Sequence, residues 1–377
     1  MSGIYVHIPF CKQACHYCDF HFSTSLKKKD QLIDALVKEI QLRKDELKDT
    51  LVNTIYFGGG TPSLLSNQEL ERLIDAIFQN YTVSDHPEIT LEANPDDLSD
   101  DRIMALAKSS VNRLSIGIQS FFESDLKLMN RAHNAEEAKS CLEVATRYFK
   151  NISLDLIYGV PGASNKQWLK NIDIALSYGV PHISSYALTV EPKTALASFI
   201  EKGIIEAVDD DQAHEQFQLL KDQLEDRDFV HYELSNFGKA GFFSQNNSAY
   251  WQGKPYLGIG PSAHSFNGTQ RGWNVRNNSK YINALQGDVL PIEIETLTIT
   301  DQYNEYIMTG LRTMWGVSFS KIENDFGKLY KDYLIQQSEV FINKHLLYID
   351  DKHLHVTKKG QFLSDGIASE LFKINLV

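Results

Sequence analysis

Residues 52–80 read VNTIYFGGGTPSLLSNQELERLIDAIFQN. The opening run, Val52–Phe57, reads as a strand that ends at a glycine triplet. Three glycines follow at positions 58–60, and Ser66 is a favoured N-cap residue before a helical pattern that ends near Phe78. This stretch therefore predicts a strand, a glycine-rich loop and a helix, in that order.

The same alternation continues on both sides of this stretch. Further strands are predicted at Gly3–Ile8, Pro87–Glu92, Asn112–Gly117, Ile152–Ile157 and His182–Leu188. Helical patterns separate them. Tandem strand–helix units predict a parallel sheet with right-handed crossovers, and the twist of such a sheet lets it curl. We therefore predict an α/β fold, with a partial (β/α)6 barrel resembling a TIM barrel and, after it, a small helix-rich C-terminal domain with a β-hairpin.

The rhythm of strands and helices changes in the last third of the chain. We place the barrel at residues 1–235, a connecting segment rich in Gly, Asn and aromatic residues at 236–292, and the C-terminal domain at 293–377. In that domain Leu346–Ile349 and Leu354–Val356 flank a polar turn, which predicts the hairpin.

The composition excludes several classes of protein. The 377 residues include 37 Lys and Arg against 49 Asp and Glu, for a net charge of −12. An acidic chain without a long basic stripe is a poor match for a nucleic-acid backbone, so we expect no nucleic-acid partner. No segment approaches the roughly 18 apolar residues of a membrane span, and the N-terminus lacks the pattern of a signal peptide. We expect a cytoplasmic protein.

Three of the four cysteines lie within eight residues. Cys11, Cys15 and Cys18 have the spacing Cys-x3-Cys-x2-Cys, whereas Cys141 stands alone in a helical pattern, as expected for a small buried apolar residue. Disulfides are rare in a reducing cytosol, and three clustered cysteines cannot pair off among themselves. A loop this short can bring three thiolates onto one small inorganic centre.

Two kinds of inorganic centre fit this loop. One is structural zinc, with His7, His16 or His21 as the fourth ligand, although zinc sites usually draw their ligands from two separated pairs. The other is an iron–sulfur cube, which normally takes four thiolates, so three leave one iron open to another ligand. The spacing favours iron–sulfur, and a zinc-stabilised barrel without redox chemistry is the alternative.

Polar residues and glycines stand at the ends of several predicted strands. The glycine triplet follows the second strand, Glu92 ends the third, Gln119 follows the fourth and Asp155 lies in the fifth. Strand ends of a parallel barrel converge on one mouth, where chemistry is placed. The triplet lacks the Lys and Ser or Thr of a nucleotide P-loop. Residues 258–263 mimic a dinucleotide fingerprint but lie beyond the strand series and carry Pro261, so we discount them.

The cysteine spacing and the glycine loop stand with other motifs. In chain order these are Tyr5–Cys11, Gly58–Pro62, Glu92–Pro95, Arg113–Ser120, Asn130-Arg131, Asp155–Gly162, Ser185–Leu188 and Tyr256–Gly260. Together they resemble the radical S-adenosylmethionine (SAM) superfamily, and their order is similar to that of its HemN/HemW branch. The resemblance covers nearly the whole chain.

The resemblance implies cofactors and the residues that hold them. Cys11, Cys15 and Cys18 would hold a [4Fe-4S] cluster, and SAM would chelate its open iron through the methionine amino and carboxylate groups. It further implies Tyr5 and Tyr17 beside the cluster and SAM, Gly59, Gly60 and Thr61 at the methionyl end, and Glu92, Gln119, Arg131 and Asp155 along the rest of the SAM pocket. Carboxylates suit a sulfonium and an ammonium, and a guanidinium suits a carboxylate.

Two departures separate the chain from the oxygen-independent coproporphyrinogen III oxidases. Those enzymes usually carry a fourth cysteine where Phe20 stands here, and a substantial segment before the first cysteine, which here is residue 11. Both departures match the HemW-like proteins, regarded as haem chaperones. The resemblance thus implies haem as a ligand and haem-accepting apoproteins as partners. A radical enzyme acting on a porphyrinogen is the alternative, and a dimer is left open.

The sequence does not settle which residue meets the haem iron. HemW-like proteins often show His-Asn-x-x-Tyr-Trp, and here residues 246–251 read Asn-Asn-Ser-Ala-Tyr-Trp, so Asn246 stands where His is expected. An amide is a poor ligand for haem iron compared with imidazole. His264 and His231 are the alternatives. Aromatic residues that can stack on a macrocycle or belong to the core are Tyr250, Trp251, Tyr256, Phe266 and Trp273.

Overall fold

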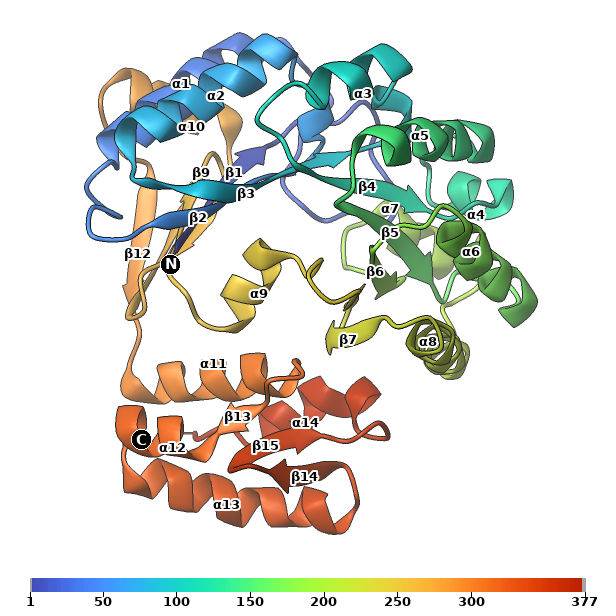
Figure 1. The fold of residues 1–377 in the computed structure, drawn as a ribbon, viewed down its shortest axis with the longest axis vertical. Helices are drawn as coiled ribbons and strands as arrows, with labels where there is room; N and C mark the ends of the chain where they lie inside the picture. The colour runs from blue at the N-terminus through green and yellow to red at the C-terminus, as the bar shows by residue number, and fades with distance from the viewer. Residues whose placement is uncertain (1, 375–377) are drawn as a thin grey trace.

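A large curved sheet organises most of the chain in the computed structural model, which describes residues 2–374 (Figure 1). The strands lie in the order β12-β11-β10-β9-β1-β2-β3-β4-β5-β6-β8-β7. Its central strands run parallel: β1 (Ser2–Ile8), β2 (Val52–Gly59), β3 (Val83–Ala93), β4 (Arg113–Gln119), β5 (Ile152–Tyr158) and β6 (His182–Ala187). Among the described strands the two ends of the sheet do not pair, so the barrel is open. The predicted fold class is confirmed.

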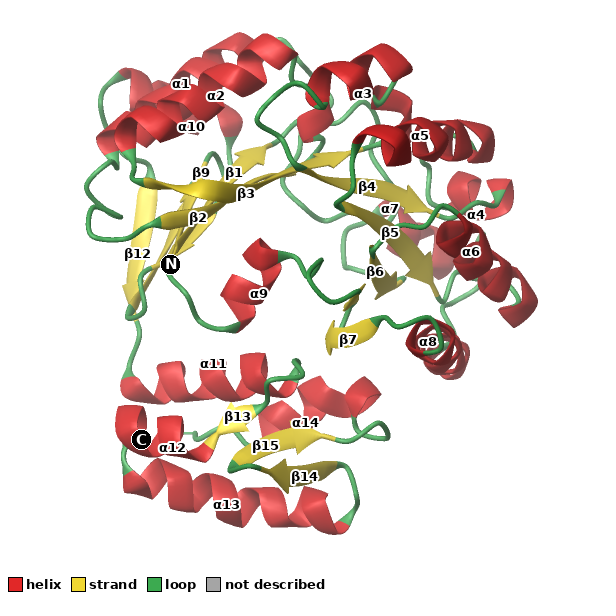
Figure 2. Cartoon of the chain, viewed as in Figure 1, coloured by secondary structure: helices red, strands yellow, loops and turns green. Residues whose placement is uncertain are grey.

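Helices cover the convex face of this sheet (Figure 2). They are α1 (Lys29–Leu42), α2 (Asn67–Asn80), α3 (Asp100–Leu106), α4 (Glu123–Leu128), α5 (Ala135–Tyr148), α6 (Asn165–Ser177) and α8 (Asp210–Glu225), whereas α7 (Ala195–Glu201) contacts the cysteine loop through His16. Helix α2 begins as expected, because Ser66 accepts a hydrogen bond from the backbone of Glu69 while the Glu69 carboxylate accepts one from the backbone of Ser66. Its buried side chains, among them Leu70 and Leu73, face the sheet.

The central strands are apolar because helices cover them on one side and the barrel interior lies on the other. Ile4, Val6 and Ile8 of β1 are fully buried, as are Ile55 and Phe57 of β2. Continuous apolar runs of this kind are typical of parallel strands that are buried on both faces. At the carboxyl ends of these strands stand Gly59, Glu92 and Gln119.

Residues 230–296 add strands to both ends of the sheet. Beyond β6 lie β8 (Asn236–Gly238) and β7 (Val230–Glu233), both in antiparallel pairings. At the other end β9 (Tyr256–Ile259) runs parallel to β1, and the antiparallel strands that follow are β10 (His264–Phe266), β11 (Gln270–Asn274) and β12 (Ile292–Thr296). Strands on both sides of residue 236 thus belong to one sheet, and the division of the chain into three parts stays a prediction.

Two helices of this region lie on opposite sides of the sheet. Helix α9 (Gln245–Trp251) packs against β1 and β2 on the concave face, where it fills the barrel interior (Figure 1). Helix α10 (Asn278–Gln286) packs beside α1 on the convex face.

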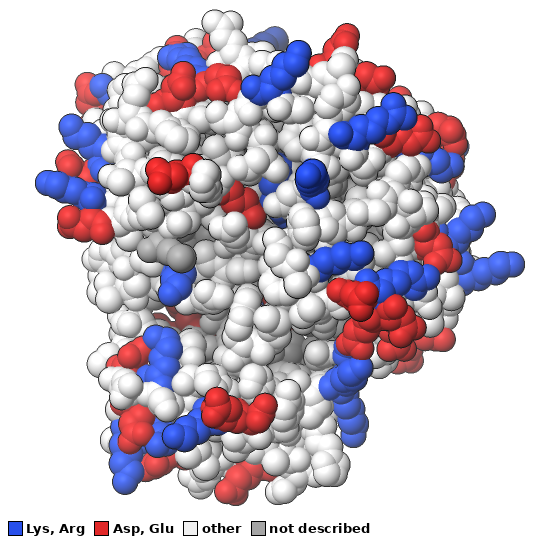
Figure 3. All heavy atoms as spheres, viewed as in Figure 1, with Lys and Arg blue, Asp and Glu red and all other residues white. Residues whose placement is uncertain are grey.

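A second, smaller unit follows β12. It contains α11 (Ile299–Leu311), α12 (Phe319–Phe326), α13 (Lys328–Asn343) and α14 (Ser364–Glu370) around a sheet of β13 (Val317–Ser318), β15 (His353–Val356) and β14 (Leu347–Asp350). The predicted hairpin is β14–β15. The unit has its own buried apolar cluster, which includes Tyr303, Ile307 and Leu354. No helix within residues 2–374 is long and apolar enough to span a bilayer. On the face drawn in Figure 3, basic and acidic side chains are interspersed over both units.

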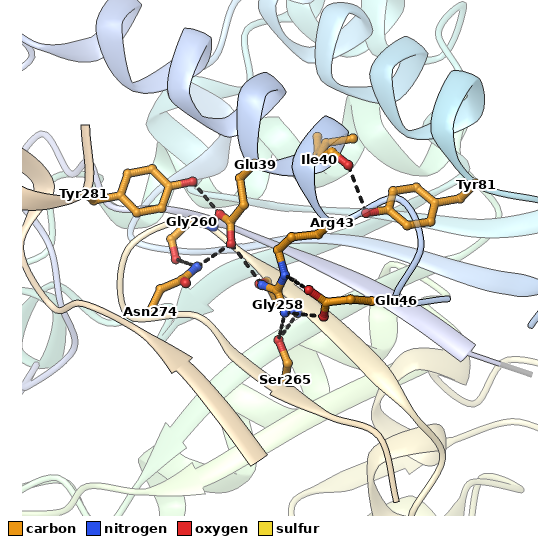
Figure 4. A network of polar contacts seen from close by, with 10 residues as sticks. All are labelled: Glu39, Ile40, Arg43, Glu46, Tyr81, Gly258, Gly260, Ser265, Asn274 and Tyr281. Carbon is orange, nitrogen blue, oxygen red and sulfur yellow. Dashed lines mark hydrogen bonds and ion pairs between the residues drawn. The ribbon is translucent and has the colours of Figure 1, made fainter. Parts of the chain in front are cut away.

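A buried ion pair on α1 fastens the added strands to the barrel (Figure 4). Arg43 and Glu39 lie 2.9 Å apart, and their side chains are 1% and 0% exposed. Arg43 donates to the carbonyl of Gly258 at 2.8 Å and to the hydroxyl of Ser265 at 3.1 Å, while Glu39 accepts from the backbone N–H of Gly260 at 2.8 Å. Asn274 and Tyr281 also donate to Glu39. A buried ion pair is tolerated when its remaining polar atoms are satisfied in this way.

Candidate cofactor site

A cavity of about 180 Å³ opens at the carboxyl ends of the central strands. Its wall brings together every residue predicted for the cofactor site except Tyr5, namely Cys11, Cys15, Tyr17, Cys18, Gly59, Gly60, Thr61, Glu92, Gln119, Arg131 and Asp155. Tyr5 lies in the wall of a second cavity, of about 510 Å³. The two cavities are neighbours, because both are lined by Phe20, Gly59 and Glu92.

The cysteine loop connects β1 to α1 and is fixed to the loop after α4. Asn130 adopts a left-handed backbone conformation (φ 55°), accepts from the Gln13 side chain at 2.9 Å and donates to the carbonyl of Ala14 at 2.7 Å. The imidazole of His16 is bonded to the carbonyl of Leu128 at 2.8 Å. These contacts hold the loop over the strand ends with its three thiols partly exposed to the cavity.

Burial favours the protonated form of two thiols of this loop, those of Cys11 and Cys18. Burial raises the pKa of Cys18 to about 11, and burial also raises the pKa of Cys11. Cys15 lies 3.3 Å from a guanidinium nitrogen of Arg131. Three sulfur donors on one short loop, with no fourth cysteine beside them in the cavity wall, match the donor set of an iron–sulfur cube with one open iron. The cysteines therefore fit the iron–sulfur cluster that the sequence predicts.

The histidines near the loop have other partners. The two ring nitrogens of His7 are bonded to the hydroxyl of Tyr5 and to the carbonyl of His21, at 3.2 and 3.1 Å. His21 is bonded to the side chain of Asn278 at 2.7 Å, and His16 to Leu128 as described. Within residues 2–374, no three His, Cys, Asp or Glu side chains are arranged to hold a single metal ion. That finding includes the three cysteines and does not separate zinc from iron–sulfur, but the hydrogen bonds of the three histidines leave none of them placed as a fourth zinc ligand.

The glycine triplet forms a close-fitting wall beside Glu92. The Glu92 carboxylate accepts from the hydroxyl of Tyr56 at 2.8 Å and from the backbone of Gly59 at 3.1 Å, and burial raises its pKa. Gly59 has φ 111°, and a Cβ added there would lie 2.6 Å from the ring of His7. A Cβ on Gly60 would lie 2.7 Å from the carbonyl oxygen of Phe10. Only glycine fits, and the backbone stays open to a ligand.

Arg131 is aimed into the cavity from the opposite side. One of its terminal nitrogens lies 3.3 Å from the sulfur of Cys15 and 3.4 Å from the hydroxyl of Tyr17. The other donates to the carbonyl of Gly117 at 3.1 Å and to the side chain of Asn94. Its Nε is buried and has no hydrogen-bond partner among the described residues. A buried guanidinium N–H without a partner is costly, so a carboxylate that reached it would be bound favourably.

Asp155 and Gln119 complete the wall. Burial and the neighbouring Glu92 raise the pKa of Asp155 to about 7, so the carboxyl is only partly ionised at neutral pH. It accepts from the hydroxyl of Ser115 at 3.3 Å. A cation in the cavity would favour its ionised form. Gln119 ends β4 with φ 64°, an uncommon conformation for a residue other than glycine.

Four wall or supporting residues were not singled out from the sequence. Asn94 links Arg131 to the hydroxyl of Thr61, to which it donates at 3.2 Å, and Asn130 holds the cysteine loop. Both stand inside motifs that the sequence analysis quotes, so a signal existed. Ser115, which supports Asp155, also stands inside a quoted motif, whereas Tyr56, which supports Glu92, looks like an ordinary strand residue in sequence.

Comparison with known proteins accounts for this arrangement. Family models match at residues 5–175, described as the radical SAM superfamily, and at residues 297–363, described as the HemN C-terminal domain. The protein named heme chaperone HemW of Lactococcus lactis subsp. lactis is 35% identical over 97% of this chain and 96% of its own length. The chain belongs to the HemW family. The HemW of Bacillus subtilis is 33% identical, over 97% of this chain and 98% of that protein.

The solved structure of HemN, the coproporphyrinogen III oxidase of Escherichia coli, shares the fold of this HemW-family chain. The TM-score is 0.86, with 23% identity over 99% of this chain and 90% of that one. Membership of the radical SAM superfamily implies a [4Fe-4S] cluster and SAM as cofactors.

This HemW-family chain places the residues considered as haem ligands in different surroundings. Asn246 is buried where α9 packs on the concave face of the sheet. Its side-chain oxygen accepts from Thr54 at 3.0 Å and its backbone N–H donates to Glu88 at 3.2 Å. His231 is bonded to the carbonyl of Leu234 and stacks on Phe237 with ring centres 4.3 Å apart. His264 is exposed and lies in the wall of the second cavity.

Four of the five aromatic residues singled out from the sequence line the second cavity or a third one. Tyr250 and Tyr256 line both the second cavity and a third one between the barrel and the C-terminal unit. Trp251 and Phe266 line the third cavity, and Trp273 lies beside His264.

Proposed function

We propose that this chain is a haem chaperone, which binds a [4Fe-4S] cluster, SAM and haem and delivers haem to acceptor proteins. Relatives that match over nearly the whole chain carry the name heme chaperone HemW. The observation that carries the proposal is that a three-thiol cavity adjoins a larger second cavity through the shared residues Phe20, Gly59 and Glu92. A cytoplasmic location and the identity of the acceptors belong to the proposal.

The cluster is assigned to the loop between β1 and α1. Cys11, Cys15 and Cys18 would each bind one iron, and their thiols must lose protons as they do so. When bound, a cluster of this type supplies an electron at low potential to SAM. Arg131, 3.3 Å from the Cys15 sulfur, offsets the negative charge that a thiolate-bound cluster brings into the cavity.

The SAM pocket is assigned to the rest of the wall. The unpartnered Nε of Arg131 is suited to the carboxylate of the methionyl group, and Glu92 and Asp155 are suited to its positive ammonium and sulfonium groups. Gly59, Gly60 and Thr61 offer backbone close to the ligand, and Gln119 offers an amide. Tyr17 lies on the cluster side of Arg131, whereas Tyr5 faces the second cavity through its contact with His7.

The alternative function is that of a radical enzyme acting on a porphyrinogen. Its support is the fold shared with HemN, which is evidence of architecture and not of activity. The position where coproporphyrinogen III oxidases usually carry a fourth cysteine is Phe20, whose side chain is 68% exposed at the junction of the two cavities.

One experiment separates the two functions. The chain is reconstituted anaerobically with iron and sulfide, loaded with haem and mixed with an apo-haem protein, and transfer is followed in the visible spectrum. In parallel, the unloaded chain is incubated with SAM, a reductant and coproporphyrinogen III. We expect haem transfer without release of CO2. Robust decarboxylation together with no haem transfer would overturn the proposal.

A further inference from the structure

The second cavity contains one histidine whose ring has no hydrogen bond. Its wall includes His7, His21 and His264. His7 is bonded through both ring nitrogens and His21 through one. His264 is exposed, and among residues 2–374 neither of its ring nitrogens has a hydrogen-bond partner. Its imidazole is therefore free to bind a ligand in the cavity.

The backbone of His264 is held in place by the glycine-rich stretch before it. A Cβ added at Gly258 would lie 2.0 Å from the carbonyl oxygen of His264, so any side chain there would displace this strand. Gly260 has φ 105° and Ser262 has φ 66°, which turns the chain sharply from β9 into β10. The stretch that superficially mimics a dinucleotide fingerprint thus positions His264 at the cavity.

The buried ion pair of α1 fixes the residues on both sides of this turn (Figure 4). Arg43 binds the carbonyl of Gly258 and the hydroxyl of Ser265, the residue directly after His264. Glu39 binds the backbone N–H of Gly260. Because the pair is almost fully buried, these contacts are shielded from water, and they make the base of His264 rigid.

The rest of the cavity wall is suited to a flat, apolar ring with anionic arms. Phe20 is 68% exposed and lines this cavity, so its apolar ring is accessible to a flat ligand. Tyr250 and Tyr256 meet edge to face, with ring centres 4.4 Å apart. Arg276 donates to the carbonyl of Asp19, and within the described part of the chain it makes no ion pair with a carboxylate. The acidic residues of this wall are Asp19 and Glu92.

We propose that His264 is the axial ligand of the haem iron, with the macrocycle against Phe20 and a propionate at Arg276. This assignment rests on the proposed haem-binding function. Neutral imidazole is a common ligand of haem iron, and a guanidinium binds a carboxylate through two parallel hydrogen bonds. Asn246 does not serve, because its amide is buried and bonded to Thr54. His231 does not serve, because its ring is stacked on Phe237 and lies outside this cavity.

Haem titration of the full-length chain tests this assignment. Wild type, His264→Ala, Arg276→Gln and the control His86→Ala are titrated with haemin under anaerobic conditions, and the Soret band, the electron paramagnetic resonance spectrum and the dissociation constant are recorded. His86 is also exposed but lines neither cavity. We expect His264→Ala to weaken binding about tenfold or more and to lose the signature of histidine ligation, and added imidazole to restore that signature. Arg276→Gln should weaken binding a few-fold with the ligation signature unchanged.

The outcomes distinguish this assignment from the proposed function. If wild type takes up no haem, the proposed function fails. If wild type and His264→Ala bind haem with the same affinity and the same spectrum, haem binding stands and the ligand assignment is wrong. His264→Ala removes an exposed ring without hydrogen bonds, so folding should be retained, and the circular dichroism spectrum and cluster content check this. A His264→Met variant, expected to change the ligation signature and not to abolish it, gives an independent reading.

Discussion

Protonation of single groups governs what the cavity can bind. Burial raises the pKa of the Cys18 thiol to about 11 and that of the Asp155 carboxyl to about 7. Loss of solvent favours the uncharged form of both groups, with Glu92 adding to the effect at Asp155, and a positively charged partner in the cavity would favour ionisation of both. The apo chain therefore carries less negative charge at these two positions than the loaded chain would.

Asp155 should make the stability of the cluster-free chain depend on pH. An ordinary Asp has a pKa of 3.8, and here it is about 7, so the folded chain binds the proton more tightly than the unfolded chain does. Below pH 4 the carboxyl is protonated in both states and does not lower the free energy of unfolding. Between pH 4 and pH 7 it lowers that free energy increasingly, by an upper bound of about 4 kcal/mol. Relative to wild type, Asp155→Asn should gain stability between pH 4 and pH 8, as measured by urea unfolding.

The control for Asp155→Asn is Asp34→Asn, which removes a carboxylate that is 66% exposed on α1. Its stability relative to wild type should change little over the same range. A difference between Asp155→Asn and wild type that stays constant with pH would contradict the account of a desolvated carboxyl.

Removing one cysteine of the loop should abolish the cluster. Cys11→Ala should lower the iron content from about four per chain to less than about one and remove the absorbance near 400 nm, because two remaining thiolates cannot hold a cube. The control is Cys141→Ala, since Cys141 is buried in α5, away from the cavity, and its substitution should leave iron unchanged. Metal analysis with sulfide determination measures both. Full iron in Cys11→Ala would contradict the assignment.

Motifs made most of the site predictable from the sequence. Cys11, Glu92 and Asp155 stand out because their spacing and positions at strand ends are unusual for structural residues. Tyr56 did not stand out, because its role comes from a hydrogen bond across strands to Glu92. Contacts between residues that are far apart in sequence leave no local pattern.

At the scale of elements, long periodic segments could be predicted and short ones could not. Helices α2 and α5 carry caps and apolar stripes, and the central strands are apolar runs bounded by glycine or polar residues. Strand β10 has three residues and α9 has seven, too short for any period to show. Their places follow from the Glu39–Arg43 pair and from the hydrogen bond between Thr54 and Asn246, which only the fold brings together.

Breaking the buried ion pair should destabilise the chain strongly. Arg43→Met leaves the Glu39 carboxylate buried without its cation and frees the carbonyl of Gly258 and the hydroxyl of Ser265. We expect a loss of about 3–5 kcal/mol in the free energy of unfolding. Thermal and urea unfolding of the cluster-free chain measure it.

The matched control removes an ion pair between α2 and α1 that is exposed to solvent. Arg72 and Asp34 lie 2.8 Å apart with side chains 50% and 66% exposed, so Arg72→Met should cost less than about 1 kcal/mol. Equal losses in the free energy of unfolding for Arg43→Met and Arg72→Met would show that burial of the Glu39–Arg43 pair does not contribute to stability.

At the scale of the whole molecule, residues from distant parts of the chain form two adjoining cavities. The barrel strands and the cysteine loop form the first, and β1, α9 and the strands added after residue 255 close the second. The general order of strands and helices was predictable, but this adjacency was not, because it depends on β9 pairing with β1 across some 250 residues of sequence. A cofactor in the first cavity and a ligand in the second would share Phe20, Gly59 and Glu92.

The most direct test of the central claim is the stoichiometry of haem uptake by the reconstituted wild-type chain. The chain is purified anaerobically, supplied with iron and sulfide, and titrated with haemin while the Soret band is recorded. A haem chaperone predicts saturable binding of one haem per chain, with a spectrum distinct from that of free haem. A non-saturating titration, indistinguishable from haem with a protein that has no haem site, would contradict the account.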